Sequence, residues 1–235
     1  KKFIYSSSSS IYGDVDKFPI KEDVPPKPIS PYGVTKLAGE NLCYSYCKSF
    51  GVPVLSFRYF TVYGPRQRPD MAFNIFISRM LKNKPLPVFH GGNQVRDFTY
   101  VSDVVNLLAD AAKSKHAGEA VNIAGGGYIS VNNVLKIISG IIGTKFNVKY
   151  AGKPEGDVKK TWADIGKARK LFGYSPEYDL KTGLKNQVEY MIECNGSVTG
   201  DKPGFSRLKR FAKGRSNAGF VPDKPCSYPS TDRIW

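Results

Sequence analysis

Apolar residues along the chain come in short runs that alternate with longer segments of helical spacing. Two β-like runs, 2–6 and 53–59, flank the segment Pro31–Phe50, which carries the end signals of a helix. Ser30 is placed to cap its first turn, Pro31 suits that turn, and Gly51 is placed to end it. Two strands joined by a helix imply a parallel sheet.

The same alternation continues downstream as far as Ile192. Ser130 is placed as the cap of a helix that starts at Val131, and 90–93 is predicted to be a turn. The spacing predicts further helices at 73–82, 101–113, 165–172 and 180–192, and strands at 86–89, 120–124 and 145–150.

Length and composition fit one or two domains with a real core. The chain has 235 residues, of which 41% are hydrophobic. It has no run of about 18 apolar residues that would span a membrane, and Lys1–Ser6 is no signal peptide. We therefore expect a cytoplasmic protein with no membrane partner.

The cysteines and histidines do not form a metal motif. His90 and His116 lie far apart, and no CxxC pair occurs. We expect no metal, and free thiols in a reducing compartment at Cys43, Cys47, Cys194 and Cys226.

The net charge of +15 raises the question of nucleic acid. Residues 1–193 contribute +10 and the short segment 194–235 contributes +5. No helix concentrates the basic residues in one stripe, so we expect no nucleic-acid partner and attribute part of the excess to an anionic substrate. The segment 194–235 is rich in Gly, Ser, Pro, Lys and Arg without periodicity, which predicts a basic, disordered tail.

Tyr32 and Lys36 are the first candidates for chemistry. Their spacing of four places them on one face of the predicted helix, one turn apart. A cation beside a phenol favours the phenolate, which lets the tyrosine act as a base nearer neutral pH. The serine run Ser6–Ser10 adds hydroxyl donors, although such a pair can also be an ordinary surface contact.

Four motifs resemble a known family. They are the 2–36 stretch ending in Tyr32-Gly33-Val34-Thr35-Lys36, the stretch 58–73, Arg96-Asp97-Phe98-Thr99-Tyr100-Val101, and the segment from Gly156-Asp157 to Asp164. Over roughly residues 1–193 the chain resembles the extended short-chain dehydrogenase/reductase family, in its nucleotide-sugar epimerase and dehydratase branch.

The resemblance implies an α/β fold: the C-terminal part of a Rossmann-type parallel sheet with helices on both faces, plus a smaller α/β substrate-binding domain. It assigns 1–64, joined by 96–124, to the NAD-binding domain, and 65–95 with 125–193 to the substrate domain. A glycine-rich turn that holds the cofactor pyrophosphate should precede the first strand. The chain does not open with one, and Gly125–Gly127 follows a later strand, so we expect an N-terminally truncated chain.

The resemblance also implies NAD as cofactor and assigns roles to residues. Tyr32 would take a proton from a sugar hydroxyl, and Lys36 would bind the nicotinamide ribose. Ser8, four positions before Tyr12-Gly13, would bond the reacting oxygen. Ser6 and Tyr59 are expected to complete the cofactor contacts.

The two residues after Ser8 separate reaction types. Dehydratases of this branch carry an acidic pair there, and decarboxylases a glutamate, whereas this chain has Ser9 and Ser10. Neither serine can act as an acid or base near neutral pH, so a 4-epimerase is favoured over a dehydratase or decarboxylase. A non-catalytic nucleotide-sugar-binding fragment is a further alternative.

The remaining assignments concern a UDP-sugar substrate. Ser9, Ser10 and Thr61 could bond a hexuronate carboxylate or a hexose 6-hydroxyl, and Arg68 adds positive charge, which favours UDP-glucuronate over UDP-glucose. Arg96 is expected at the diphosphate and Phe89 against the uracil.

Asp157 is expected to contact nucleotide or ribose. Many relatives carry Arg three positions earlier, where this chain has Pro154, and Lys153 is a partial substitute. The 31–50 helix, with Leu37, Leu42, Tyr44, Tyr46 and Phe50, is either the contact face of a homodimer or a face packed on the sheet.

Overall fold

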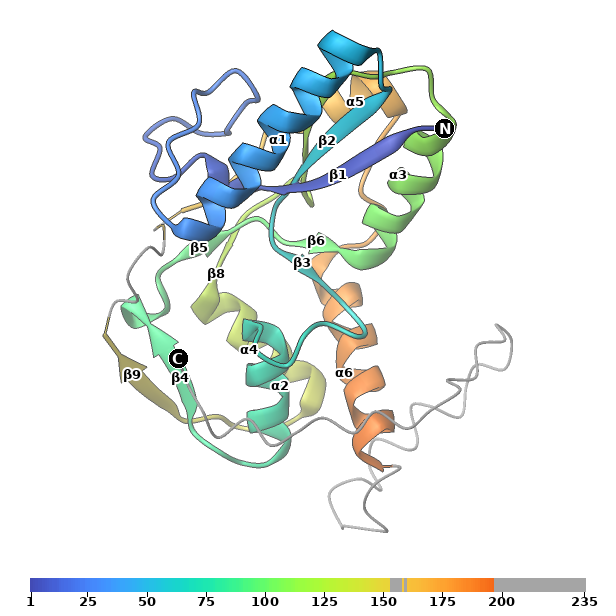
Figure 1. Ribbon diagram of the computed structural model, residues 1–235. Helices are drawn as coiled ribbons and strands as arrows, with labels where there is room; N and C mark the ends of the chain where they lie inside the picture. The colour runs from blue at the N-terminus through green and yellow to red at the C-terminus, as the bar shows by residue number, and fades with distance from the viewer. Residues whose placement is uncertain (153–157, 159, 197–235) are drawn as a thin grey trace.

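A three-stranded parallel sheet forms the centre of the first part of the molecule. The computed structural model describes residues 1–152, 158 and 160–196. The strands β1 (Phe3–Ser8), β2 (Val54–Tyr59) and β7 (Glu119–Ile123) lie in the order β1-β2-β7 (Figure 1). The register pairs Ser8 with Tyr59, and Tyr59 with Ile123, so the three strands end level with one another.

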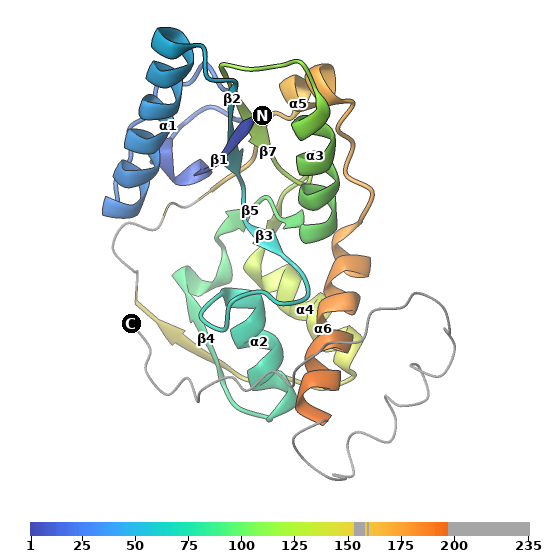
Figure 2. The same cartoon turned by 45° about the vertical axis from the view of Figure 1, so that its right-hand side comes forward.

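Helices cover both faces of this sheet. The helix α1 (Pro31–Phe50) lies on one face, and α3 (Val101–Lys113) and α5 (Gly166–Phe172) lie on the other (Figure 2). Leu55, Phe57, Val121 and Ile123 of the sheet are fully buried in the first hydrophobic core. The predicted α/β class and parallel strand–helix–strand unit are confirmed.

The ends of α1 form as the sequence predicts. The Ser30 hydroxyl accepts a hydrogen bond from the Gly33 amide at 3.1 Å, which satisfies one unpaired donor of the first turn. Gly51 ends the helix in the left-handed conformation, with φ 65°. In α4 (Val131–Ile142), the Ser130 hydroxyl caps the Asn133 amide in the same way.

A second core holds the other helices together. It contains α2 (Ala72–Leu81), α4 and α6 (Leu180–Gly196), with β4 (Leu86–Phe89) paired in parallel with β9 (Val148–Ala151). Its fully buried members include Ile77, Leu86, Val134, Leu135, Ile138 and Leu184.

Short pairings link the two cores. The two-residue strands β3 (Val62–Tyr63) and β6 (Thr99–Tyr100) pair in parallel, and β5 (Val95–Arg96) and β8 (Ile129–Ser130) pair in antiparallel fashion. Two 3₁₀ turns complete the order, η1 (Ser9–Ile11) and η2 (His90–Gly92). None of the two-residue strands was predicted from the sequence.

The structure differs from the sequence prediction in the packing of one helix and in the ends of several elements. Helix α5 falls inside 125–193, yet Ala168 packs in the first core with Ala163, Ile165 and Tyr174, so this segment does not belong to the second core. Helix α6 continues past Ile192 to Gly196, and β9 starts at Val148 rather than at Lys145. Residues 197–235, with Cys226, lie outside the described residues.

Across the described part of the chain, no helix combines the length and apolar character needed to cross a membrane. Cys43 and Cys47 are free thiols.

Candidate active site

The carboxyl ends of β1 and β2 bring several predicted site residues to one edge of the sheet. Ser6 and Ser8 belong to β1, and Tyr59, opposite Ser8, ends β2. In open parallel α/β sheets, ligands bind in the crevice outside this edge. Burial raises the pKa of Tyr59, so its phenol stays neutral near pH 7 and does not act as a base.

The serine run turns sharply where β1 ends. The Ser8 hydroxyl accepts a hydrogen bond from the Ser10 amide at 3.2 Å and caps η1. Gly33 packs against this turn, because a Cβ atom there would lie 2.6 Å from the Ser10 carbonyl oxygen. Only glycine allows this approach, which seats the first turn of α1, with Tyr32, directly on the serine run.

Tyr32 and Lys36 lie together on α1, as their spacing predicts. The Lys36 ammonium is 5.6 Å from the centre of the Tyr32 ring and 5.6 Å from that of Tyr5. It donates a hydrogen bond to the Ser6 carbonyl at 2.8 Å, which ties it to the end of β1. Tyr32 is 55% exposed, so its phenol is open to a substrate.

Sequence reasoning missed a buried ion pair that lies one helical turn beyond Lys36. Glu40, one turn beyond Lys36, accepts a hydrogen bond from the Ser7 hydroxyl at 2.8 Å. Its carboxylate also pairs with the Arg58 guanidinium, which donates through Nε at 3.1 and 3.2 Å and through Nη2. Both side chains are less than 10% exposed. The signal in the sequence was the i, i+4 step from Lys36 and a lone arginine in an apolar strand.

Arg58 extends the contacts to the loop that follows η1. Its Nη1 donates to the Tyr12 hydroxyl at 2.8 Å and to the Glu22 carbonyl at 3.0 Å. The Tyr12 hydroxyl donates to the Asn122 side chain at 2.7 Å. Burial raises the pKa of Tyr12 to about 12, although Arg58 opposes this shift, so Tyr12 is a neutral hydrogen-bonding group.

The predicted substrate residues are spread over both cores. Ser9 and Ser10 form the turn beneath α1, and Thr61 follows β2, where its carbonyl accepts the Thr99 amide at 2.9 Å. The Arg68 side chain is 74% exposed and pairs with Asp70 at 2.8 Å, so the structure does not bring it against the serine turn.

Phe89 ends β4, and Arg96 lies in β5 and donates to its neighbour's carbonyl at 3.0 Å. Both are half-buried. Asp157, Pro154 and Lys153 lie outside the described residues. The substrate-binding roles of all these residues stay predictions.

Asp97 is a second group that sequence reasoning missed. Its side chain is completely buried and accepts hydrogen bonds from the Gly125 amide at 2.9 Å and the Ala163 amide at 3.3 Å. Burial raises the pKa of Asp97 to about 7, with the backbone donors opposing the shift. Asp97 directly follows Arg96, and these two hydrogen bonds connect it to the distant segments that contain Gly125 and Ala163.

The residues at the sheet edge fit the nicotinamide-ribose end of a dinucleotide. An ammonium has three N–H donors, so Lys36 keeps donors for ribose hydroxyls beside the one that it gives to Ser6. The exposed Tyr32 phenol lies on the same side of α1. The neutral Tyr59 phenol stands at the adjacent strand end.

Comparisons with known proteins agree with this arrangement. Residues 1–124 match the model of the NAD dependent epimerase/dehydratase family. A protein of Bacillus subtilis (strain 168) named an uncharacterized UDP-glucose epimerase is 47% identical over 80% of this chain and 60% of its own length. The UDP-glucuronate 4-epimerase of Thermodesulfobacterium geofontis is 41% identical over 82% of this chain and 60% of its own length.

A solved structure shares the same arrangement of elements. The UDP-glucuronic acid 4-epimerase of Bacillus cereus, in complex with UDP-glucuronic acid and NAD, superposes with a TM-score of 0.79 at 44% identity. The match covers 82% of this chain and 62% of that one. The chain thus spans about 60% of the length of these two relatives. From its fold, its motifs and this similarity, the chain belongs to the NAD-dependent epimerase/dehydratase family.

Proposed function

We propose that the protein is an NAD-dependent nucleotide-sugar 4-epimerase, with UDP-glucuronate as the favoured substrate and UDP-glucose as the alternative. The observation that carries the proposal is the placement of Tyr32 and Lys36 on a serine turn that carries no carboxylate. Relatives and structural neighbours named as UDP-sugar 4-epimerases support it.

The residues divide the proton chemistry among them. When bound, NAD supplies the hydride acceptor and donor at sugar C4. Tyr32 accepts the proton of the C4 hydroxyl while that carbon is oxidised to the ketone, and it returns the proton when the ketone is reduced from the other face. Lys36 places its positive charge 5.6 Å from the centre of the Tyr32 ring, and the Ser8 hydroxyl bonds the reacting oxygen.

The environment of Glu40 also favours epimerisation over dehydration. Removal of water from a 4-keto sugar needs a further acid or base beside the neighbouring carbons. Glu40 lies on the same helix as Tyr32, but it is buried and engaged by both Ser7 and Arg58. Ser9 and Ser10 occupy the positions where an acid would act, so the 4-keto sugar can only accept the hydride back.

The choice of glucuronate rests on the hydroxyl groups near the sugar. Ser9, Ser10 and Thr61 can each donate a hydrogen bond to a carboxylate, and charge-assisted bonds of this kind are stronger than neutral ones. Arg68 lies on the segment that follows Thr61, on an exposed position that leaves its side chain adjustable.

The proposal includes a homodimer formed through α1. The side chains of Leu42, Tyr44, Tyr46 and Phe50 are all more than half exposed, whereas Leu37 packs against the first core. Tyr46 and Phe50 contact each other with ring centres 5.3 Å apart, so these two rings form one exposed apolar patch.

The test uses the full-length protein with NAD, incubated separately with UDP-glucuronate and UDP-glucose, with products resolved by NMR. We expect the C4 epimer of one sugar without loss of water or carbon dioxide, and no product from Tyr32→Phe. A 4-keto-6-deoxy sugar or a pentose would contradict epimerisation. Normal turnover by Tyr32→Phe would contradict the assigned base.

The alternative of a non-catalytic binding protein makes a different prediction. Such a protein would bind UDP-sugars, purify without NAD and convert neither sugar. NAD that remains bound through purification, together with turnover, would exclude it.

A further inference from the structure

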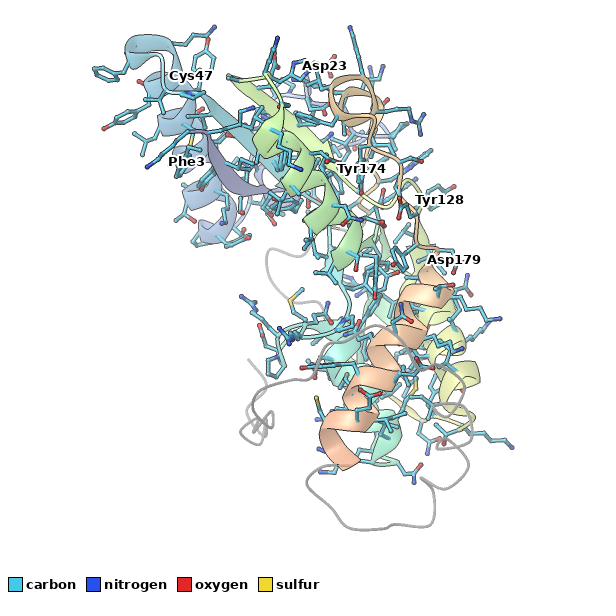
Figure 3. All side chains as sticks on the ribbon, turned by 90° about the vertical axis from the view of Figure 1, so that its right-hand side faces the viewer. Phe3, Asp23, Cys47, Tyr128, Tyr174 and Asp179 are labelled. Carbon is cyan, nitrogen blue, oxygen red and sulfur yellow. The ribbon has the colours of Figure 1, made fainter. Side chains whose placement is uncertain are left out.

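A buried glutamine on α6 holds the loop that follows β3. Gln187 is only 1% exposed, although its amide is polar. Helix α6 begins just after Asp179, which Figure 3 labels at its start, and runs past this loop. In Figures 1 and 2 the loop between β3 and α2 turns beside the upper half of α6.

Both ends of the Gln187 amide bind the loop. Its oxygen accepts a hydrogen bond from the Gly64 amide at 3.1 Å, and its nitrogen donates to the Gln67 side-chain oxygen at 2.9 Å. The nitrogen of Gln67 donates in turn to the Val62 carbonyl at 3.0 Å. Asn74 donates to the Gln67 carbonyl at 3.0 Å, which fixes the far end of the loop on α2.

The backbone conformation shows why such an anchor is needed. Gly64 has φ 137°, and a Cβ atom there would lie 2.6 Å from the Val101 side chain. Arg66 has φ 66°, which is strained for a residue with a side chain and persists only where the surroundings enforce it. On α6, a Cβ atom at Gly183 would lie 2.2 Å from the Tyr63 hydroxyl, so the helix is seated directly on β3.

The anchored segment carries both predicted sugar-site residues beyond the serine turn. Thr61 comes just before β3, and Arg68 directly follows Gln67. We propose that Gln187 is a positioning residue for the sugar-binding part of the substrate site, acting through Gly64 and Gln67. This inference rests on the proposed function, because it takes Thr61 and Arg68 as contacts of the sugar.

The sugar and the nucleotide of the substrate are assigned to different elements of the protein. The loop would contact the sugar, whereas the nucleotide is assigned to Phe89 and Arg96 on other elements. Loss of the anchor should therefore weaken binding of UDP-glucuronate and leave binding of UDP unchanged. A merely destabilising change would weaken both.

The experiment measures both affinities by calorimetry in the full-length, NAD-loaded protein, in a Tyr32→Phe background that stops turnover. Gln187→Met keeps the side-chain length and removes both hydrogen bonds. We expect affinity for UDP-glucuronate to fall about tenfold and that for UDP to change by less than about twofold, since the Gly64 backbone N–H and the Gln67 side-chain oxygen lose their partner.

Two further variants sharpen the result. Gln67 lies on the loop and is half-buried, and Gln67→Met should also weaken binding of UDP-glucuronate more than binding of UDP. The loss in the double variant should be smaller than the sum of the two single losses, because both variants break the contact between these two side chains. Asn186→Leu is the matched control: its amide donates to the Tyr100 hydroxyl at 3.1 Å rather than to the loop, and both affinities should stay unchanged.

Equal losses for UDP and UDP-glucuronate, or no loss for either, would overturn the inference. Amide hydrogen exchange keeps it testable apart from the proposed function. Gln187→Met should speed exchange at the Gly64 amide in the ligand-free protein, and unchanged exchange would overturn the inference. A wild-type protein that binds neither ligand would instead contradict the proposed function.

Discussion

At the scale of single residues, the buried ion pair of Glu40 and Arg58 connects the elements that carry the candidate active site. The pair is removed from water, so its stability depends on each charge keeping its partner and its hydrogen bonds. Ser7 and Tyr12 complete those bonds. Since Ser7 precedes Ser8 and Glu40 lies one turn from Lys36, the pair fixes the end of β1 against α1.

Replacement of Glu40 by glutamine should be costly. Glu40→Gln leaves the Arg58 charge buried without a counterion, which typically costs about 3–5 kcal/mol. Urea unfolding of the full-length protein measures the loss. The control is Glu119→Gln, because the pair of Glu119 with Lys167 at 2.8 Å is partly exposed. That change should cost under about 1 kcal/mol. Equal costs for the two variants would contradict the assigned role of burial.

Asp97 should make stability depend on pH. Its carboxyl has a pKa of about 7 when folded and an ordinary value near 3.8 when exposed. Between these values the folded protein holds a proton that the unfolded chain releases, so the contribution of Asp97 to stability is full below the lower value and is lost as pH rises to about 7.

The Asp97→Asn variant removes this titration. Urea unfolding at about pH 5 and pH 8 should show the wild-type protein losing stability relative to the variant as pH rises. Tyr174 is the phenol that interacts with the Asp97 charge, and its own pKa is raised by burial, so it stays neutral over this range. If the difference in unfolding free energy between the two proteins were the same at both pH values, the assignment of Asp97 as a buried, titrating carboxyl would be wrong.

The sequence identified some of these residues and not others, for a physical reason. Tyr32 and Lys36 are four apart on a helix, so local geometry alone brings them together. Glu40 has the same spacing, but its partners come from β1 and β2, whose register opposes Ser7 to Arg58. A register between distant strands is not visible in a periodic pattern, and the same holds for the donors to Asp97.

At the scale of elements, α1 is placed by a glycine on its inner face. Gly33→Ala would push a methyl group against the Ser10 carbonyl. Because this contact is tightly packed, the variant should lower the free energy of unfolding by about 1–3 kcal/mol. The variant should also lower kcat, because Tyr32 moves away from the serine turn.

Gly140 supplies the matched comparison. It lies exposed in α4, where an added Cβ atom would meet nothing within 4 Å. Gly140→Ala should therefore stabilise the protein by about 0.5–1 kcal/mol through helix propensity alone. Thermal and urea unfolding measure both variants. A Gly33→Ala protein as stable and active as Gly140→Ala would show that α1 is not seated on the turn.

Helices were predicted better than the short strands. The caps at Ser30 and Ser130 and the stop at Gly51 are local signals, and the structure confirms them. The strands β3, β5, β6 and β8 have two residues each, and they exist only because segments far apart in the sequence meet. Such pairings have no periodicity to detect.

At the scale of the whole molecule, the chain crosses between two cores several times. The 125–193 region was assigned to the substrate side, yet α5 returns to the first core through Ala168, and the Tyr174 hydroxyl donates to the Ala124 carbonyl at 2.9 Å. The sequence of a short amphipathic helix does not show which of two cores the helix packs against. The family resemblance gave the fold class correctly, and the packing of α5 required the structure.

The exposed face of α1 leads to a prediction about assembly. Tyr46 lies between Leu42 and Phe50 at helical spacing, and all three are more than half exposed on the side away from the sheet. A charge at the centre of an apolar dimer contact must be desolvated on association, so Tyr46→Glu should cost at least about 2 kcal/mol of dimer affinity.

Sedimentation equilibrium of the full-length protein measures this. The wild-type protein should sediment as a dimer and Tyr46→Glu as a monomer at the same concentration. Tyr150→Glu is the control, since Tyr150 is 66% exposed on β9, on the other core. Because Tyr46 lies more than three turns from Tyr32 on α1, the monomer should keep the arrangement of Tyr32, Lys36 and the serine turn. A Tyr46→Glu protein that still sediments as a dimer would place the contact on another surface.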